Sequence, residues 1–153
     1  MFFFPILFLD VLDLSQNNFT GKFPFKAISN LTSLQYLDLS LNSLTGSLPN
    51  ALFNLTALYK VILSSNKFTG DIPSAIDNLS SLQVLQLNNN TFSGSITKSL
   101  GNLLVLETLA LEGNNFSGSI PNSVCSLVTS RSLTEITSDC LKSVGCECCT
   151  QCY

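Results

Sequence analysis

The chain of 153 residues has no histidine and no tryptophan, and only 11% of its residues are charged. The absence of histidine excludes the Ser-His-Asp and Cys-His systems of nucleophilic catalysis and every zinc site that uses histidine. Seven Lys and Arg stand against ten Asp and Glu, and this net charge of −3 argues against a nucleic-acid partner. No apolar run approaches the length of a membrane helix, since the longest covers residues 1–9 and stops at Asp10.

The sequence also lacks the local motifs of common enzymes. It contains no nucleophile elbow, phosphate-binding loop or kinase motif. The carboxylates of Asp13 and Asp38 occupy equivalent places of a repeated unit, which favours a structural origin over acid–base chemistry. We therefore expect a protein that is not an enzyme and needs no cofactor or metal, while 45% hydrophobic residues exclude a disordered chain.

What the sequence does contain is one unit repeated five times. Asparagines recur at intervals of 25, 24, 24 and 24 residues, and a glycine lies four positions after each of them. Apolar residues stand three, five, eight and eleven positions before each asparagine. A fixed period of this length predicts a solenoid, in which neighbouring units stack around one core. The recurring residues, called the ladder asparagines below, are Asn17, Asn42, Asn66, Asn90 and Asn114.

Each recurring position has a mechanical role. Apolar residues five and three before the asparagine, such as Leu37 and Leu39, alternate with period 2 and predict a short strand with one face in the core. The ladder carboxamide is expected to satisfy backbone groups of its own coil and of a neighbouring coil. The glycine allows the unusual backbone angles of a corner. An aromatic or leucine two positions after each asparagine predicts a stacked spine made of Phe19, Leu44, Phe68, Phe92 and Phe116.

The unit N-x-[FL]-[TS]-G-x-[ILF]-P resembles the plant-type leucine-rich repeat over roughly residues 6 to 127. Such repeats occur in plant receptor-like kinases, receptor-like proteins and inhibitors of cell-wall-degrading enzymes. The resemblance implies an α/β solenoid: a right-handed curved horseshoe with a parallel concave sheet of short strands and 3₁₀ or helical segments on the convex side. We expect repeats over residues 1–127 and a cap over 128–153. Thr97 replaces the proline of the fourth unit, and the first unit has one extra residue near Phe25 and Lys26.

Six cysteines lie within the last 29 residues, where a solenoid needs a cap over its core. This segment resembles the Cys-rich terminal cap of leucine-rich repeat proteins from diatoms and related algae. An even number of cysteines predicts three disulfides and an oxidising compartment, although six cysteines allow 15 pairings. Adjacent Cys148 and Cys149 are not expected to pair with each other. The cysteines are Cys125, Cys140, Cys146, Cys148, Cys149 and Cys152.

A thiolate zinc site is the competing interpretation of the same cysteines. The pattern C-x-C-C-x-x-C is dense enough to supply four ligands, but it lacks the usual pair of C-x₂-C motifs. A redox role for the C-x-x-C of Cys149 and Cys152 is disfavoured, because the thioredoxin-type βαβ context is absent. Disulfides are the favoured interpretation.

The N-terminal end carries no comparable cap. Ile6 and Leu9 already stand in the register of the repeat, and residues 1–5 have neither the basic region nor the cleavage site of a signal peptide. We expect the chain to be the C-terminal piece of a longer repeat protein or an incomplete gene product. The alternative is a complete short protein whose N-terminal Phe cluster covers its first coil. We expect a monomer, or weak association through the uncapped coil.

Six N-x-[ST] sequons are present, and each is a glycan acceptor in a secreted protein. The repeat itself generates such triplets, so part of the signal comes from the template. Asn18 and Asn115 stand beside ladder asparagines and are expected to be crowded; the sixth sequon is at Asn89. The predicted glycosylation sites are Asn30, Asn54 and Asn78.

Strand residues that alternate with the core leucines are expected to form columns on the concave side. The L-D-L-S pattern at Asp13 and Asp38 favours a structural role for both carboxylates. Two tyrosines stand near the middle of this face, and tyrosine is a favoured binding residue because it buries a large area at low entropic cost. We predict a ligand patch, centred on its two tyrosines, Lys60 and Ile62, that consists of Tyr36, Asp38, Tyr59, Lys60, Ile62, Gln86, Asn88 and Glu112.

Two functional hypotheses remain from the sequence. The first is an extracellular or cell-surface recognition module whose concave face binds a protein, peptide or glycan; disulfides, sequons and the plant-type repeat favour it. The second is an intracellular scaffold with a zinc-bound cap. The resemblance alone adds a third hypothesis, an inhibitor of a cell-wall hydrolase. No residue names the ligand.

Overall fold

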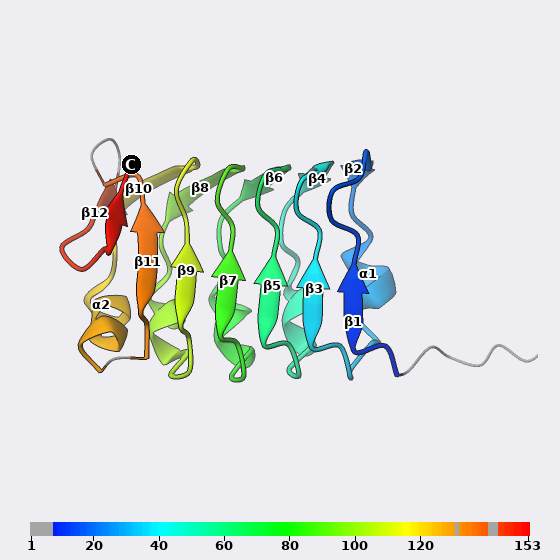
Figure 1. Cartoon of the computed structure of the whole chain (residues 1–153), viewed down its shortest axis with the longest axis horizontal. Coiled ribbons are helices and arrows are strands. Elements are labelled where there is room, and N and C mark those ends of the chain that lie inside the picture. Colours follow the sequence, from blue (N-terminus) through cyan, green and yellow to red (C-terminus); the bar gives the residue numbers. More distant parts are fainter. Residues whose placement is uncertain (1–7, 131, 141–143) are drawn as a thin grey trace, which may run out of the picture.

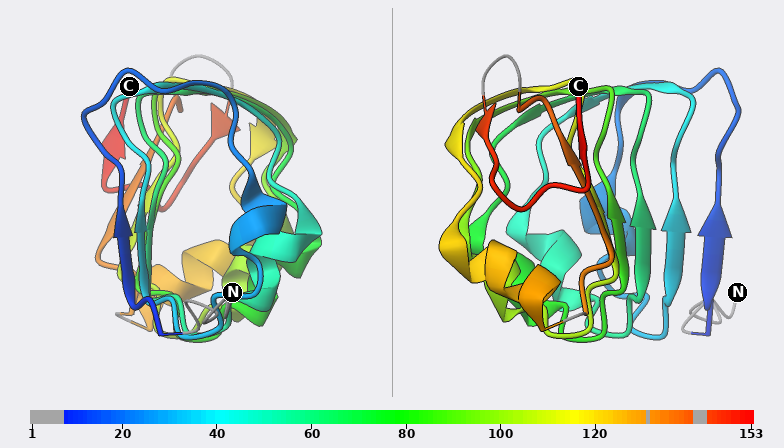
Figure 2. Two further views of the ribbon diagram at one scale, coloured as in Figure 1. Left: turned by 90° about the vertical axis from the view of Figure 1, so that its right-hand side faces the viewer. Right: turned by 60° about the vertical axis from the view of Figure 1, so that its left-hand side comes forward.

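The computed structural model describes residues 8–130, 132–140 and 144–153 of the chain. It is a leucine-rich-repeat-type solenoid in which successive coils each contribute one short strand to each of two parallel sheets (Figure 1). Seen along the stack, the first sheet lies on one side of every coil, and the helical turns lie on the opposite side (Figure 2, left). The predicted fold class is therefore confirmed. The N-terminal Phe cluster and Ile6 lie outside the described residues.

The first sheet consists of the strands predicted from the alternating leucines. Within the described residues it has seven strands, all parallel and in chain order. Equivalent residues stand directly opposite one another in the five repeat strands, as in Val11 opposite Tyr36 and Tyr36 opposite Lys60. The strands are β1 (Val11–Asp13), β3 (Tyr36–Asp38), β5 (Lys60–Ile62), β7 (Val84–Gln86), β9 (Thr108–Ala110), β11 (Glu135–Ser138) and β13 (Gln151–Cys152).

The second sheet is also parallel, but its register differs. In each pair of neighbouring coils, the residue three positions after the first ladder asparagine lies opposite the residue one position after the second ladder asparagine. Thr45 thus lies opposite Lys67, and Thr69 lies opposite Thr91. Equivalent residues of successive coils are thus displaced by two positions, which the repeat pattern does not reveal. The strands are β2 (Thr20–Lys22), β4 (Ser43–Gly46), β6 (Lys67–Gly70), β8 (Thr91–Ser95), β10 (Asn115–Ser119) and β12 (Val144–Gly145).

Short helical segments follow the second-sheet strands, as predicted for the convex side. The first is α-helical, whereas the next three are 3₁₀, and the extra residue of the first unit lies in this α-helical turn. Where Thr97 replaces proline, its hydroxyl accepts a hydrogen bond of 3.3 Å from the Ser99 amide and caps the 3₁₀ turn. The segments are α1 (Phe25–Ile28), η1 (Asn50–Asn54), η2 (Ser74–Asn78), η3 (Lys98–Asn102) and α2 (Asn122–Thr129).

One continuous core runs through the stack. From Leu34 onward the recurring leucines are buried, with Leu37, Leu63 and Leu87 fully inaccessible to solvent. Those of the first coil, Leu9, Leu12 and Leu14, are only partly buried. The predicted spine holds in its later coils, where Phe92 stacks on Phe68 and on Phe116 with 6.2 Å between ring centroids in each pair. At the N-terminal end the spine differs from the prediction. Phe19 is 46% exposed, and Phe25 packs against Phe68 instead.

The ladder asparagines join the coils through their carboxamides. The Asn90 Nδ2 donates to the carbonyls of Leu63 and Leu87 at 2.9 and 3.0 Å, while its Oδ1 accepts from the Phe68 amide at 2.9 Å. Asn42, Asn66 and Asn114 repeat these contacts. These asparagines satisfy backbone groups that would otherwise be buried without partners.

A second corner precedes each ladder asparagine. The residue just before it adopts a left-handed backbone with φ between 54° and 69°. Gly113 occupies this position in the last repeat, but Leu41 occupies it with φ 55° in the second. A β-carbon makes this conformation costly, by roughly 1–2 kcal/mol for most residues. The repeat pattern predicts unusual angles only for the glycines after the asparagine, such as Gly46 with φ 100°.

The C-terminal cap closes the solenoid and extends both of its sheets. β11 pairs with β9, β13 pairs with β11, and β12 pairs with β10, so the sheets cross the expected boundary at 127/128 without interruption. The six cysteines form three disulfides, and the adjacent Cys148 and Cys149 have different partners. The pairs are Cys125–Cys148, Cys140–Cys152 and Cys146–Cys149.

Candidate functional site

The outward side chains of the first sheet form straight columns, because the strands pair in register. One column contains chemically different neighbours from coil to coil, and strand β11 adds a sixth member, which lies beyond the five repeats. Neighbouring strands lie about 4.8 Å apart, so adjacent members are in contact range. In order the column is Val11, Tyr36, Lys60, Val84, Thr108 and Glu135.

Tyr36, Asp38 and Lys60 form a contiguous polar cluster on this face. The Tyr36 hydroxyl donates to Asp38 Oδ2 at 3.2 Å, and the Lys60 Nζ lies 5.4 Å from the centre of the Tyr36 ring. The second contact is a cation–π interaction, which holds the ammonium over the ring face. Burial raises the pKa of the Tyr36 hydroxyl to about 12, and the negative charge of Asp38 adds to this shift.

The aspartates of the L-D-L-S pattern accept hydrogen bonds from backbone amides, which is the structural role that the repeat pattern predicts. Asp38 Oδ1 accepts from the Ser40 amide at 2.8 Å, and Asp13 Oδ1 accepts from the Ser15 amide at 2.9 Å. Hydrogen bonds from the Ser15 side chain and backbone lower the pKa of the Asp13 carboxyl. Asp38 is only 7% exposed, so its carboxylate is engaged within the fold and offers little surface to a ligand.

The other predicted patch residues differ in their accessibility. Tyr59 precedes β5 and is 38% exposed, whereas Ile62 is buried with only 8% of its surface accessible. Gln86 and Asn88 are partly exposed on and after β7. Glu112 lies beyond β9, and its Oε2 accepts a hydrogen bond from the Thr137 hydroxyl of β11. The structure thus groups Tyr36, Asp38, Tyr59 and Lys60, while Glu112 belongs to the capped end.

The capped end carries acidic residues, of which Glu135 and Asp139 lie outside the counted repeats. Glu135 of β11 lies opposite Thr108, and it is exposed, as is Glu107. Asp139 Oδ2 accepts from the Gly113 and Asn114 amides at 2.7 and 3.3 Å, in place of the carbonyls that a further coil supplies elsewhere. The predicted boundary separates residues 128–153 from the repeats, whereas Ile136 of β11 continues the register of Leu109 in β9.

The predicted glycosylation sites lie on the side opposite the first sheet. Asn54 and Asn78 are the last residues of η1 and η2, and Asn30 follows α1. All three are exposed. Glycans on them would leave the first sheet uncovered.

Two hollows lie at the N-terminal end of the stack rather than on the first sheet. Phe23 and Pro24 line both, together with Lys22, and Phe19 lines one of them. None of the helices in the described part of the chain is long and apolar enough to span a membrane.

Comparisons with known proteins agree with this architecture. The family profile described as a leucine-rich repeat region matches residues 5–147. Receptor-like protein 7 of Arabidopsis thaliana is 53% identical over 47 residues, which is 31% of this chain and 5% of that relative.

Two solved structures are similar over most of the chain. The plant peptide hormone receptor RGFR1 in complex with RGF2 has a TM-score of 0.75 and 40% identity over 78% of this chain and 19% of its own. The ectodomain of the receptor kinase GASSHO1/SCHENGEN3 from Arabidopsis thaliana, in complex with Casparian strip integrity factor 2, has a TM-score of 0.76 and 36% identity over 90% of this chain and 18% of its own. The chain thus spans less than a fifth of each of these relatives.

Proposed function

Since this chain belongs to the leucine-rich repeat family, we propose that it is an extracellular recognition module of a receptor-like protein and binds a peptide or protein ligand on its first sheet. One observation carries this proposal. Neighbours on the first sheet differ from coil to coil, as in the sequence Tyr36, Lys60, Val84, whereas the core beneath them repeats. A rigid scaffold that displays a non-repeating surface is suited to recognition.

The disulfides of the C-terminal cap favour an extracellular location. All six cysteines are disulfide-bonded, and structural disulfides form and persist mainly in oxidising surroundings. The similar structures support the type of ligand, since one is a peptide hormone receptor with its ligand and the other is a receptor ectodomain in a complex. Together these features favour a secreted or cell-surface protein with a peptide or protein partner.

The charges on the first sheet specify the ligand further. Lys60 of β5 offers a cation, while Glu107 and Glu135 at the capped end offer carboxylates. Three strand spacings separate β5 from β11, which is roughly 14 Å. An extended peptide covers this distance in about four residues. We therefore propose a ligand that carries an acidic group and, about four residues away, a basic group.

Binding of synthetic peptides to the oxidised chain tests this proposal. The probe is a set of extended peptides with one acidic and one basic residue at separations from two to six, measured by biolayer interferometry. A separation near four should bind best, and Tyr36→Ala/Tyr59→Ala should weaken binding by at least about tenfold, as expected for buried aromatic anchors.

The matched control removes two hydroxyls from the second sheet. Thr69→Ala/Ser93→Ala should leave both fold and affinity unchanged, because neither side chain lies on the first sheet. Equal binding at all separations would refute the charge argument. Equal affinity of the tyrosine variant and the parent would refute the placement of the ligand site on the first sheet.

A further inference from the structure

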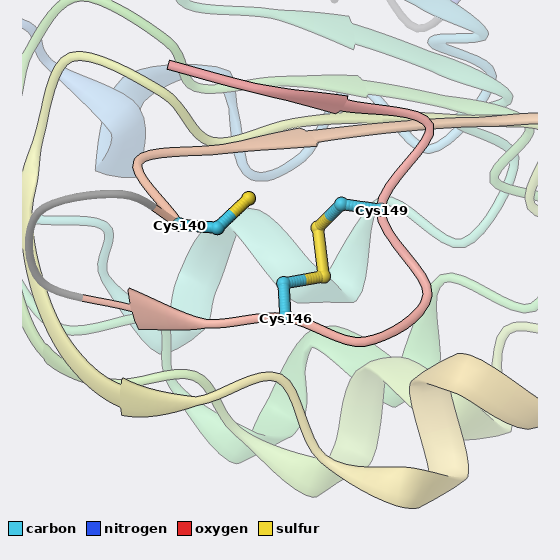
Figure 3. A group of neighbouring side chains, drawn as sticks. All are labelled: Cys140, Cys146 and Cys149. Carbon is cyan, nitrogen blue, oxygen red and sulfur yellow. A yellow bond between two sulfur atoms is a disulfide. The ribbon is translucent and has the colours of Figure 1, made fainter.

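Four cysteines of the cap gather at one place. The Sγ atoms of Cys140, Cys146 and Cys149 all lie within 4.8 Å of one another (Figure 3). Cys140 is bonded to Cys152, which brings a fourth sulfur to the group. Cys140, Cys146 and Cys149 are partly exposed, and Cys152 is exposed. The remaining disulfide, Cys125–Cys148, ties α2 to the cap and has no sulfur in this group.

We propose that the cap has a second chemical state, in which the reduced thiols of Cys140, Cys146, Cys149 and Cys152 bind one Zn²⁺. Two molecules of a dithiol reductant would open the two disulfides, each supplying two electrons and two protons and becoming a disulfide itself. The metal then displaces the four thiol protons, because zinc binds thiolates. The disulfide and zinc interpretations of the sequence thus apply to two redox states of one site.

The dimensions of the group suit a tetrahedral zinc site. Zn–S bonds are about 2.3 Å long, which places ligand sulfurs about 3.8 Å apart in a tetrahedron. The three sulfurs of the group lie within 4.8 Å of one another, so once the disulfides open, shifts of about 1 Å bring these three to ligand spacing. Cys152 supplies the fourth sulfur from its place next to Cys140. Four cysteine thiolates are an established ligand set for structural zinc.

Backbone pairing holds Cys152, and the residue before Cys146, without the help of the disulfides. Cys152 lies opposite Ser138 in the pair β11–β13, and the Tyr153 amide donates to the Ser138 carbonyl at 3.0 Å. Cys146 follows β12, where the Ile120 amide donates to the Gly145 carbonyl at 2.8 Å. One ligand backbone is therefore tied to each of the two sheets by pairing that does not depend on the disulfides.

A reductant has access to the group. A surface hollow beside Cys146 is lined by Ser119, Asn122 and Glu147, all of them exposed. Metal can enter by the same route. Partly exposed disulfides are more open to exchange than those in a closed core.

Cobalt binding by the reduced full-length chain tests the proposal. The chain is reduced with a water-soluble phosphine, which leaves no competing thiol, and is titrated with Co²⁺ and then with Zn²⁺ under nitrogen. We expect one Co²⁺ per chain, with the thiolate charge-transfer band and visible d–d bands of a tetrahedral site, and its stoichiometric displacement by Zn²⁺. The oxidised chain should bind neither metal at this site.

Matched pairs of substitutions locate the ligands. Cys146→Ser/Cys149→Ser should weaken Co²⁺ binding by about 1000-fold or more, because two of four thiolates are lost. Cys125→Ser/Cys148→Ser removes one disulfide as well, but it should retain the tetrahedral spectrum and the affinity within about threefold. Circular dichroism of both variants checks that the repeats remain folded, and the single variant Cys140→Ser serves if the first pair disrupts the cap.

Three results would overturn the proposal. The first is a reduced, folded chain that binds no cobalt. The second is an octahedral, oxygen-type spectrum. The third is an equal loss of binding in the Cys125/Cys148 control. Each would assign the four cysteines to disulfides alone.

Discussion

Replacing Asn90 with alanine is expected to destabilise the solenoid far more than the same change at Asn17. Asn90 is 7% exposed, and its carboxamide bonds to Leu63, Leu87 and Phe68. Asn17 is exposed and donates only within its own coil, to the carbonyls of Leu14 and Ser15. The two residues occupy the same position of the repeat, so the comparison isolates the contribution of the contacts between coils.

The magnitude follows from the groups left without partners. Asn90→Ala leaves the Phe68 amide without its partner, and an unsatisfied buried group costs about 1–3 kcal/mol. The carbonyls of Leu63 and Leu87 each lose one hydrogen bond but still accept from Asn66 and Asn114. With about 0.5–1.5 kcal/mol for each hydrogen bond lost there, the total is about 2–4 kcal/mol. Asn17→Ala leaves only exposed carbonyls, which water satisfies, so its cost is expected to be under about 1 kcal/mol.

Urea unfolding of the oxidised chain, followed by far-ultraviolet circular dichroism, measures the difference. With a denaturant slope of about 2 kcal/mol/M, Asn90→Ala should lower the midpoint by about 1–2 M and Asn17→Ala by less than about 0.5 M. Asn90→Asp should not rescue stability, because a carboxylate accepts from Phe68 but cannot donate to the carbonyls of Leu63 and Leu87. Equal midpoint shifts for the two alanine variants would refute the ladder argument.

Three further outcomes are expected. Leu41→Asn should raise stability by about 0.5–1 kcal/mol in urea unfolding, because asparagine tolerates the left-handed backbone at φ 55°; Leu104→Asn, at an exposed position without positive φ, should not. Phe92→Ala should cost about 3–5 kcal/mol by the same assay, since it empties the middle of an aromatic stack. Ultraviolet titration should show Tyr36 ionising near pH 12, and Asp38→Asn should lower that pKa. Because the folded pKa lies above the unfolded value of 10.0, the contribution of Tyr36 to stability is complete below pH 10 and declines between pH 10 and 12.

The repeated features of the fold were predictable because each coil contacts only its neighbours. Counting from the ladder asparagines predicts the strands, the buried leucines and the neighbours within the first sheet, since one template applies to every coil. The same counting places Tyr36 beside Lys60, although it does not foresee that the ammonium lies over the ring.

The remaining features depend on contacts that a template does not contain. The disulfide pairing depends on how β12 and β13 fold back against β10 and β11, and spacing alone leaves 15 pairings open. The role of Asp139 arises because it replaces the carbonyls of a missing coil, which is a property of the end rather than of the repeat. Phe25 enters the core from the extra residue of the first unit, where the template itself changes.

The different registers of the two sheets have a consequence for how such a chain diverges after duplication. On the first sheet equivalent positions lie opposite each other, so a newly copied unit places every charge beside its own duplicate, as Asp13 lies opposite Asp38. On the second sheet the two-residue displacement places Thr45 opposite Lys67, so a residue does not lie opposite its own duplicate in the next coil. Like-charge contacts between copies can therefore arise on the first sheet but not on the second, unless a local hydrogen bond engages the charge, as it does for Asp13 and Asp38. Divergence after duplication is thus favoured on the same surface that is available for recognition.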